Sequence, residues 1–312
     1  MFEIEPYSPS RAEEWNQFVA RSKNGTFLFD RNYMDYHSER FCDHSLMVFR
    51  RGRLYALLPG NVEKDTYFSH GGLTYGGLLT DDHATGAEIL TLFGLLNKYL
   101  RAEGLSRVVY KPTPWIYHRC PSEEDLYALI QACNARLVAR SLSSAIVKSS
   151  PAMYRIRTAG AVHAQRDGIT VGLSNDWETF WHILSDNLQT RYHLRPVHTL
   201  DEIKLLHSRF PEQIKLFAAY DSKGRVLGGT VLFFASYVAH SQYIAATTAG
   251  KKLHVLDLLF TTLIHQCLAE WPVFDFGIST EHGGTFLNES LLYQKEGFGG
   301  RAVCYDTYEW TL

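Results

Sequence analysis

A strand, a tight turn ending in Gly-Arg and a second strand are predicted by Ala219-Tyr220-Asp221-Ser222-Lys223-Gly224-Arg225-Val226-Leu227-Gly228-Gly229. An earlier stretch has the same plan, Val48-Phe49-Arg50-Arg51-Gly52-Arg53-Leu54-Tyr55-Ala56-Leu57-Leu58. Farther along, Glu124-Asp125-Leu126-Tyr127 matches Leu291-Leu292-Tyr293, and Ala135-Arg136-Leu137-Val138 matches Gly300-Arg301-Ala302-Val303. A match this long in one register indicates two copies of one domain.

Each copy has the predicted order β-α-α-β-β-β-α-β-α-β. The middle three strands form a meander, and the strand–helix–strand after them must be a crossover that makes two strands parallel. The expected fold class is α/β (α+β), with two domains in tandem, each a mixed, mostly antiparallel sheet flanked by helices. The expected boundaries are 1–150 for the first domain, 151–168 for a helical connector and 169–312 for the second domain. Function is expected where the copies meet.

Several element predictions bear directly on the site. Thr66 to Leu79 is predicted as one glycine-rich strand, and Ala87 to Glu103 as a helix closed by Gly104. Leu253 to Trp271 is predicted as one long buried helix, and Phe286 to Glu296 as a shorter one.

Composition excludes some classes of protein. The 312 residues are 46% hydrophobic, which is enough for two cores, and the formal net charge of -2 argues against a protein dominated by nucleic-acid affinity. Abundant aromatic residues favour large cores and an aromatic-lined cleft.

The cysteines and the N-terminus indicate a reducing compartment. Five cysteines without a CxxC pair predict core thiols rather than disulfides or a zinc site. Met1-Phe2-Glu3-Ile4-Glu5 lacks the pattern of a signal peptide, and no uncharged apolar run reaches about 18 residues. We therefore expect a cytoplasmic protein with no membrane span.

The element order resembles the GNAT acyltransferase fold, and two copies with a helical connector resemble the Fem-type (FemABX) aminoacyltransferases and their bacterial relatives. Three pieces carry the resemblance: Met153-Tyr154-Arg155-Ile156-Arg157-Thr158-Ala159 running to Arg166-Asp167-Gly168; Gly228-Gly229-Thr230-Val231-Leu232-Phe233; and Phe274-Asp275-Phe276-Gly277-Ile278-Ser279 with Leu292-Tyr293-Gln294-Lys295-Glu296-Gly297-Phe298-Gly299-Gly300. The last piece is the most specific.

The sequence departs from these relatives at two places. Gln294 stands where the Fem enzymes usually have Phe. The acetyl-CoA motif of the family is matched only by Gly250 within Thr247-Thr248-Ala249-Gly250-Lys251-Lys252, and the first copy has Asp81 and Asp82 at the matching place. We therefore expect the first copy to bind no coenzyme and to form a wall of the cleft.

Two candidates for chemistry lie in the second copy. Lys295 precedes Gly297-Phe298-Gly299, and the resemblance implies that it stabilises the charged intermediate; the alternative is a solvated lysine at a helix end. Gly250, Lys251 and Lys252 open a helix, which suits a phosphate of a coenzyme or of a tRNA end; the alternative is an exposed turn.

The remaining candidates are predicted to bind substrate. In the second copy they are Arg191, His193, His198, Tyr243 and Ser279, and in the first copy His70, Tyr75 and Lys111. The alternatives are a polar connector for residues 191–198, core packing for Tyr243 and a turn cap for Ser279.

Three further charged residues have open roles. Asp275 lies inside an apolar strand, so it is either a structural hydrogen-bond partner, which we favour, or a tuned base. Arg155 and Arg157 either grip a phosphate or carboxylate or lie on a solvated helix face.

These features predict an acyl- or aminoacyltransferase that forms an amide on an amine acceptor held between the two domains. The alternatives are an acetyl-CoA-dependent N-acetyltransferase and a catalytically silent ligand-binding protein. We expect no tightly bound cofactor and no metal, with acyl-CoA or aminoacyl-tRNA as the donor. The acceptor is expected to be a small-molecule or peptide-like amine, with a tRNA acceptor end as a possible partner and a monomer or weak dimer as the assembly.

Overall fold

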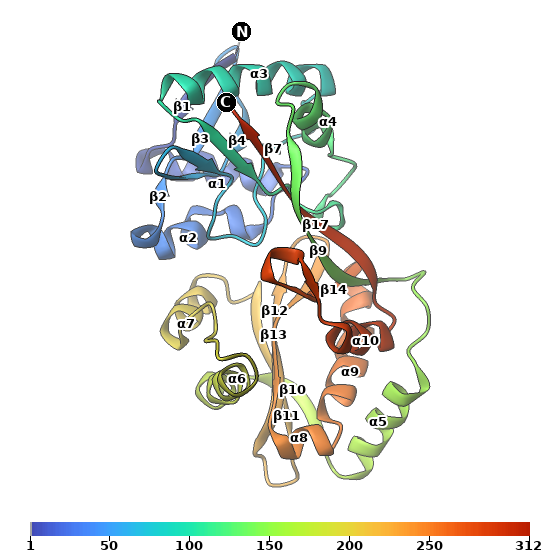
Figure 1. Ribbon diagram of the computed structural model, residues 1–312. Helices are drawn as coiled ribbons and strands as arrows, with labels where there is room; N and C mark the ends of the chain where they lie inside the picture. Colours follow the sequence, from blue (N-terminus) through green and yellow to red (C-terminus); the bar gives the residue numbers. More distant parts are fainter. Residues whose placement is uncertain (1) are drawn as a thin grey trace. The chain divides into compact units, whose positions relative to one another are not determined.

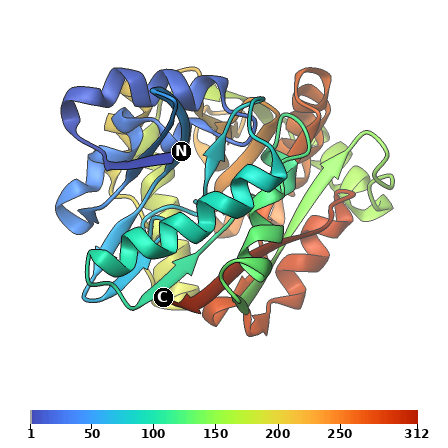
Figure 2. The same cartoon turned by 90° about the horizontal axis from the view of Figure 1, so that it is seen from above.

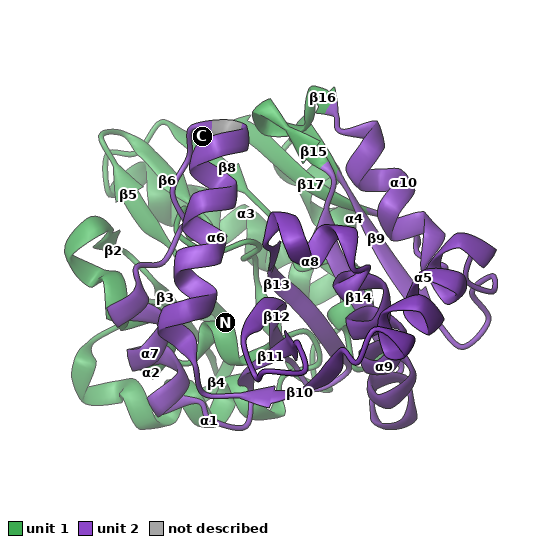
Figure 3. Cartoon of the chain, turned by 90° about the horizontal axis from the view of Figure 1, so that it is seen from below, with its two compact units in different colours: residues 1–141, 280–286, 304–312 green, residues 142–279, 287–303 purple. Residues whose placement is uncertain are grey.

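The computed structural model describes residues 2–312, which form two compact units (Figure 1 and Figure 3). Unit 1 comprises residues 1–141, 280–286 and 304–312, and unit 2 comprises residues 142–279 and 287–303. The units are therefore not consecutive stretches, unlike the expected division at residues 150 and 168. The reason is that two long strands, β9 (Arg136–Val147) and β17 (Arg301–Thr311), each contribute residues to both units.

Unit 1 contains a four-stranded sheet of order β1-β3-β4-β7 and a second set of neighbouring strands, β17-β8-β6-β5-β2. Its elements are β1 (Phe2–Pro6), α1 (Ala12–Arg21), α2 (Arg31–Met34), β2 (Cys42–Asp43), β3 (Leu46–Arg50), β4 (Arg53–Leu58), β5 (Asn61–Glu63), β6 (Thr66–Phe68), β7 (Leu79–Thr80), α3 (Gly86–Ala102), β8 (Arg107–Tyr110) and α4 (Glu124–Gln131), with short 3-10 turns between them. The helix α3, teal in Figure 2, buries Leu92 and Leu96 against the core of this unit.

The prediction of a single strand from Thr66 to Leu79 is wrong. Strand β6 ends at Phe68 and β7 begins only at Leu79, and between them His70 and Gly77 take left-handed backbone conformations. The chain folds back so tightly that a Cβ on Gly76 would lie 1.7 Å from the carbonyl oxygen of Ser69. The glycines thus form a loop rather than a strand.

In unit 2 the neighbouring strands follow the order β10-β11-β12-β13-β14-β9. Its elements are β10 (Thr170–Ser174), α5 (Arg155–Arg166), α6 (Trp177–Tyr192), α7 (Leu200–Arg209), β11 (Ile214–Tyr220), β12 (Val226–Phe234), β13 (Val238–Ala246), α8 (Thr248–Lys252), α9 (Val255–Glu270), β14 (Val273–Ile278) and α10 (Glu289–Gly297). The predicted meander is confirmed, and so is the crossover, because β14 pairs in parallel with β13 after α9. Helices α6 and α9 cover opposite faces of this sheet (Figure 1).

The predicted single helix from Leu253 to Trp271 is wrong at its start. His254 takes a left-handed conformation, with φ of 55°, and separates the five-residue α8 from α9. The expected connector helix, α5, belongs to unit 2, where Ala161 and Ala164 pack into a buried cluster with Leu258 of α9. Of the five cysteines, Cys133 and Cys267 are buried, as expected for core thiols, whereas the prediction is wrong for Cys42, Cys120 and Cys304, which are exposed.

We expect Gly229→Ala to lower the free energy of unfolding by about 1–3 kcal/mol. The strand β12 is buried along its whole length, and a Cβ on Gly229 would lie 2.5 Å from the Phe217 carbonyl oxygen and 3.1 Å from the Phe180 ring of α6. The measurement is the denaturant midpoint. Gly172→Ala, on β10, is the control, because its Cβ would meet nothing within 4 Å. Equal midpoints for the two variants would contradict this prediction.

Candidate functional site

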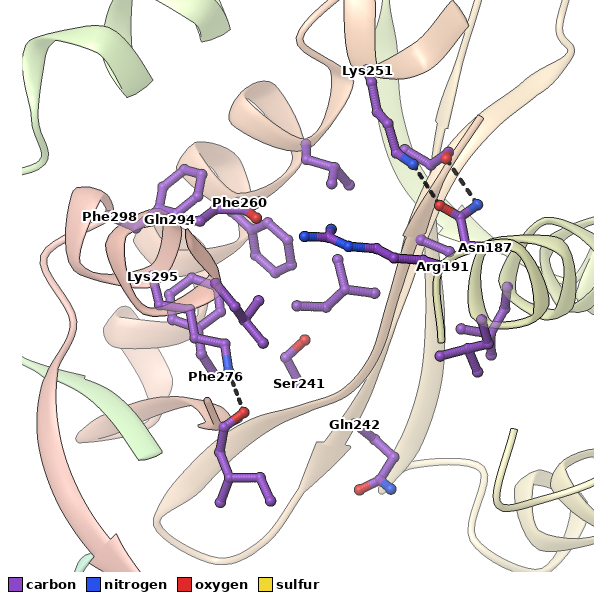
Figure 4. A pocket seen from close by; sticks show the side chains of 18 residues that line it. Asn187, Arg191, Ser241, Gln242, Lys251, Phe260, Phe276, Gln294, Lys295 and Phe298 are labelled. Atoms are coloured by element: carbon purple, nitrogen blue, oxygen red, sulfur yellow. Dashed lines mark hydrogen bonds between the residues drawn. The ribbon is translucent and has the colours of Figure 1, made fainter. Parts of the chain in front are cut away.

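A pocket of about 290 Å³ lies entirely within unit 2 (Figure 4). Its lining comes from α6, β13, α8, α9, β14 and α10. The lining residues are Leu184, Asn187, Leu188, Arg191, Ser241, Gln242, Ile244, Ala245, Ala246, Lys251, Leu256, Phe260, Phe276, Ile278, Leu291, Gln294, Lys295 and Phe298. Three of these 18 residues are lysine or arginine and none is acidic, so the pocket favours an anionic ligand with an apolar part.

The pocket opens where two parallel strands separate. Strands β13 and β14 pair at three positions, of which His240 opposite Asp275 is the last. Farther along β13 the pairing with β12 shifts register around Gln242, and β14 continues through Gly277, whose φ is +73°. Because the strands no longer pair there, Gln242 and Ile278 become part of the pocket wall.

Lys295 is a buried cation on the wall of this pocket, with 3% of its surface exposed. Its Nζ donates to the carbonyl oxygens of Gly277 at 2.8 Å and of Ile278 at 2.7 Å. Burial lowers its pKa from 10.5 to about 8, and the charge of Asp275 opposes this shift. In the described contacts, the Lys295 ammonium group donates only to neutral carbonyl oxygens. Because Lys295 is buried, it is not a solvated lysine at a helix end, which was the alternative interpretation of the sequence.

The Gly-Phe-Gly turn explains how Lys295 is held. The amide groups of Phe298 and Gly300 both donate to the Lys295 carbonyl oxygen, and Gly299 has a φ of +97°, which favours glycine. Tyr154 donates its amide to the Gly297 carbonyl oxygen at 2.7 Å. The end of α10 is therefore fixed to the start of α5.

Of the three predicted phosphate-binding residues, only Lys251 lines the pocket. Its Nζ donates to Asn187 Oδ1 at 2.6 Å, whereas Lys252 lies outside the lining; both lysines are exposed. The amide of Gly250 donates to Thr247 Oγ1, and a Cβ on Gly250 would lie 2.3 Å from the Leu227 carbonyl oxygen. Gly250 therefore allows α8 to pack closely against β12, because a residue with a side chain would not fit there.

The segment from Arg191 to His198 divides between pocket and core. Arg191 extends from α6 into the pocket toward Phe260 (Figure 4), with Nη2 3.5 Å from Ser290 Oγ. His193 is exposed and ends α6 with a φ of 55°. His198 is buried with its Nδ1 2.5 Å from the Tyr243 hydroxyl, and the ring of Tyr243 packs against Trp181. His198 and Tyr243 thus form a packed pair outside the pocket lining.

Ser279 follows the pocket residue Ile278 and is 1% exposed. Its amide donates to the Leu142 carbonyl oxygen, and its hydroxyl has no hydrogen-bond partner among the described residues. Arg157 donates to Asp257 Oδ1 at 2.9 Å and its guanidinium lies 5.3 Å from the Phe298 ring, so Arg157 holds α5 to α9. Arg155 is exposed.

The candidates of the first copy lie in unit 1. His70 is buried near His37, and burial lowers its pKa to about 3, so its ring is neutral. Tyr75 packs between Phe29 and Tyr117 in the core. The Lys111 Nζ donates to the Leu73 carbonyl oxygen at 2.5 Å, and burial lowers its pKa to about 8.

Sequence reasoning missed several pocket residues. Asn187, Ser241 and Gln242 were not singled out, because each lies among other polar residues of its helix or strand. Gln294, noted only as a departure from the family pattern, lines the pocket next to Lys295. His240, which pairs with Asp275, was also missed.

Residues 152–283 match the family model described as an acetyltransferase (GNAT) domain. Three solved structures share the fold over nearly the whole chain. The crystal structure of FemX has a TM-score of 0.71, 12% identity and coverage of 99% of this chain and 97% of its own. The C-terminal domain of a putative lysylphosphatidylglycerol synthetase from Agrobacterium fabrum has a TM-score of 0.61, 12% identity and coverage of 96% and 91%. A tandem GNAT protein from the clavulanic acid biosynthesis pathway has a TM-score of 0.53, 10% identity and coverage of 100% and 98%.

No curated protein matches the sequence. Along residues 2–312 every helix is too short or too polar to cross a membrane. In the same residues no three histidine, cysteine or acidic side chains lie together as metal ligands would.

Proposed function

We propose, on the premise that this chain has the tandem GNAT fold, that it transfers an acyl or aminoacyl group from a thioester or ester donor to an amine. The donor occupies the pocket of unit 2, and the product is an amide. The observation that carries the proposal is Lys295, a buried cation on the pocket wall whose described partners are two carbonyl oxygens. A cation without a described carboxylate partner is available to a developing negative charge.

The reaction needs a hydrogen-bond donor for the developing oxyanion and the exclusion of water, and the pocket residues supply both. Attack of the amine on the donor carbonyl places negative charge on the carbonyl oxygen, and the Lys295 ammonium donates a hydrogen bond to it. The phenylalanines Phe260, Phe276 and Phe298 exclude water from the same wall, which strengthens this interaction. The amine proton leaves as the amide forms and the donor's thiol or alcohol departs.

The charges of the pocket support a donor that carries an anionic group. Lys251 lies on the α8 side of the pocket, and Arg191 reaches from α6 across the pocket toward Phe260 (Figure 4). A phosphate near Lys251 would leave the acyl carbon free to reach Lys295. The acceptor site between the two domains stays a prediction.

The experiment is a thermal-shift panel followed by a transfer assay. The panel contains acyl-CoAs, aminoacyl-ester fragments of tRNA and peptidoglycan precursors. A donor at 100 times its Kd should stabilise the protein by about 2.7 kcal/mol. Transfer of a labelled acyl group to an amine would support the proposal, whereas binding of a ligand without any transfer would support the silent binding protein.

We expect Lys251→Ala to raise the KM of the donor by about 10- to 150-fold, because one charge-assisted hydrogen bond to an anion contributes about 1.5–3 kcal/mol. The kcat should change little, because Lys251 is remote from Lys295. Lys252→Ala is the matched control, since Lys252 is the exposed neighbour outside the pocket. Equal KM values for the two variants would exclude a donor anion at Lys251.

A further inference from the structure

Asp275 lies at the last paired position of β13 and β14, where the pocket begins. It is 0% exposed, and its partner in the ladder is His240. The pocket lining starts immediately beyond this pair, with Ser241 on β13 and Phe276 on β14. The pair therefore sits at the closed end of the split between the strands.

Donors from three segments converge on the Asp275 carboxylate. Ser143 Oγ on β9 donates to Oδ1 at 2.6 Å, the Gly277 amide donates to Oδ1 at 3.1 Å, and His240 Nδ1 lies 2.9 Å from Oδ2. A buried carboxylate is tolerated only where such donors compensate for lost water. Asp275 is thus held in one orientation.

Gly277 connects Asp275 with Lys295. Its amide binds the carboxylate, and its carbonyl oxygen accepts from Lys295 Nζ. A Cβ on Gly277 would lie 3.1 Å from His240 Cε1, so the imidazole ring packs directly on this residue. The orientation of Gly277 therefore depends on the Asp275 carboxylate, which accepts from its amide. It also determines the position of the Lys295 ammonium group, which donates to its carbonyl oxygen.

We propose that Asp275 is a positioning residue, which orients Gly277 and thereby aims the Lys295 ammonium into the pocket. The role depends on the proposed function, because it concerns the group that stabilises the reaction's negative charge. The bonds to Ser143 and His240 keep the carboxylate in the orientation that this requires. Asp275 itself does not line the pocket.

The charge of Asp275 also acts on Lys295. The other charged or titratable groups around Lys295 are Glu296 on α10, Arg157 on α5, His240 on β13, and Arg191 and Lys251 across the pocket. Asp275 is the acid that raises the pKa of Lys295 against the effect of burial. Removal of its charge should lower the pKa of Lys295 further and leave less of the ammonium form at neutral pH.

The first experiment needs no substrate. An amine-reactive reagent is applied over pH 6–10, and mass spectrometry measures the extent of reaction at Lys295 and at the exposed Lys252. In the intact protein the midpoint for Lys295 is expected at about 8. In Asp275→Asn it should shift to lower pH while Lys252 stays the same. An unchanged midpoint in a folded Asp275→Asn protein overturns the proposal, whether or not the protein proves to be a transferase.

The second experiment uses the transfer reaction. Asp275→Asn should lower kcat by about tenfold or more with little change in KM, which is the size of effect that outer partners have on the groups they orient. The alkaline limb of its pH–rate profile should shift to lower pH. Asp257→Asn is the matched control, since Asp257 is another buried acid of unit 2 and lies outside the pocket lining. An equal loss in both variants overturns the proposal.

Ser143→Ala is the variant to measure if Asp275→Asn does not fold. It removes one donor from the carboxylate and leaves the charge in place. We expect kcat to fall about threefold or more at unchanged KM. An unchanged kcat, with or without a lower Tm, overturns the proposal.

Discussion

Lys295→Met is expected to lower kcat by about 10²–10³-fold, the usual cost of removing one donor to a developing oxyanion. Methionine fills a similar volume without an ammonium group, and its neighbours Phe276 and Phe298 are apolar. The Kd of the donor should change little, because Lys251 and Arg191 remain in place. Single-turnover kinetics and equilibrium binding measure the two quantities separately.

Lys252→Met controls for the loss of a lysine from the same unit. If Lys295→Met abolishes donor binding and turnover together, Lys295 holds the ground state rather than the transition state. Retained turnover in Lys295→Met would exclude the proposed role altogether.

The same variant should become more stable relative to the natural protein at neutral pH than at alkaline pH. The pKa of Lys295 is about 8 in the folded protein and 10.5 in the unfolded chain, so the buried cation costs about 3 kcal/mol of stability below pH 8. The penalty disappears as pH rises from 8 to 10.5, because the folded lysine loses its proton while the unfolded one keeps it. Methionine does not titrate and has no such penalty.

The difference in unfolding free energy between Lys295→Met and the natural protein should therefore shift by about 2 kcal/mol, in favour of the natural protein, between pH 7 and pH 9.5. The loss of two hydrogen bonds to carbonyl oxygens affects both pH values equally and cancels in this comparison. Urea denaturation at the two pH values measures it. A difference independent of pH would mean that the lysine titrates as an exposed one does.

Local signals allowed most of the secondary structure to be predicted. Gly104 ends α3 in a left-handed conformation, and Asp176 caps α6 with a bond to the Thr179 amide. The predictions failed where the backbone leaves strand or helix geometry although the sequence pattern of a strand or helix continues. His70 and His254 both take positive φ values, and a histidine in the sequence does not by itself indicate this.

Predictions about the site also depended on whether a residue's position is fixed by its neighbours in the chain or by distant contacts. Lys295 could be singled out because the turn that holds it follows directly in the chain. Gly250 and Lys252 have the right residue types, but the amide of Gly250 binds Thr247 and Lys252 lies outside the pocket lining. Tyr243 and His198 satisfy each other in the core, 45 residues apart, which no local pattern predicts.

The sequence by itself determined the order of strands and main helices in the second copy, the crossover after β13, and the turn behind Lys295, because each depends on residues near one another in the chain. Only the tertiary structure decided which side chains share the pocket, since its wall comes from six elements between Leu184 and Phe298. The same holds for the contact between Asp275 and Ser143, which are 132 residues apart. Contacts between distant residues arise from packing, and packing reflects the shape of the whole unit rather than any one segment.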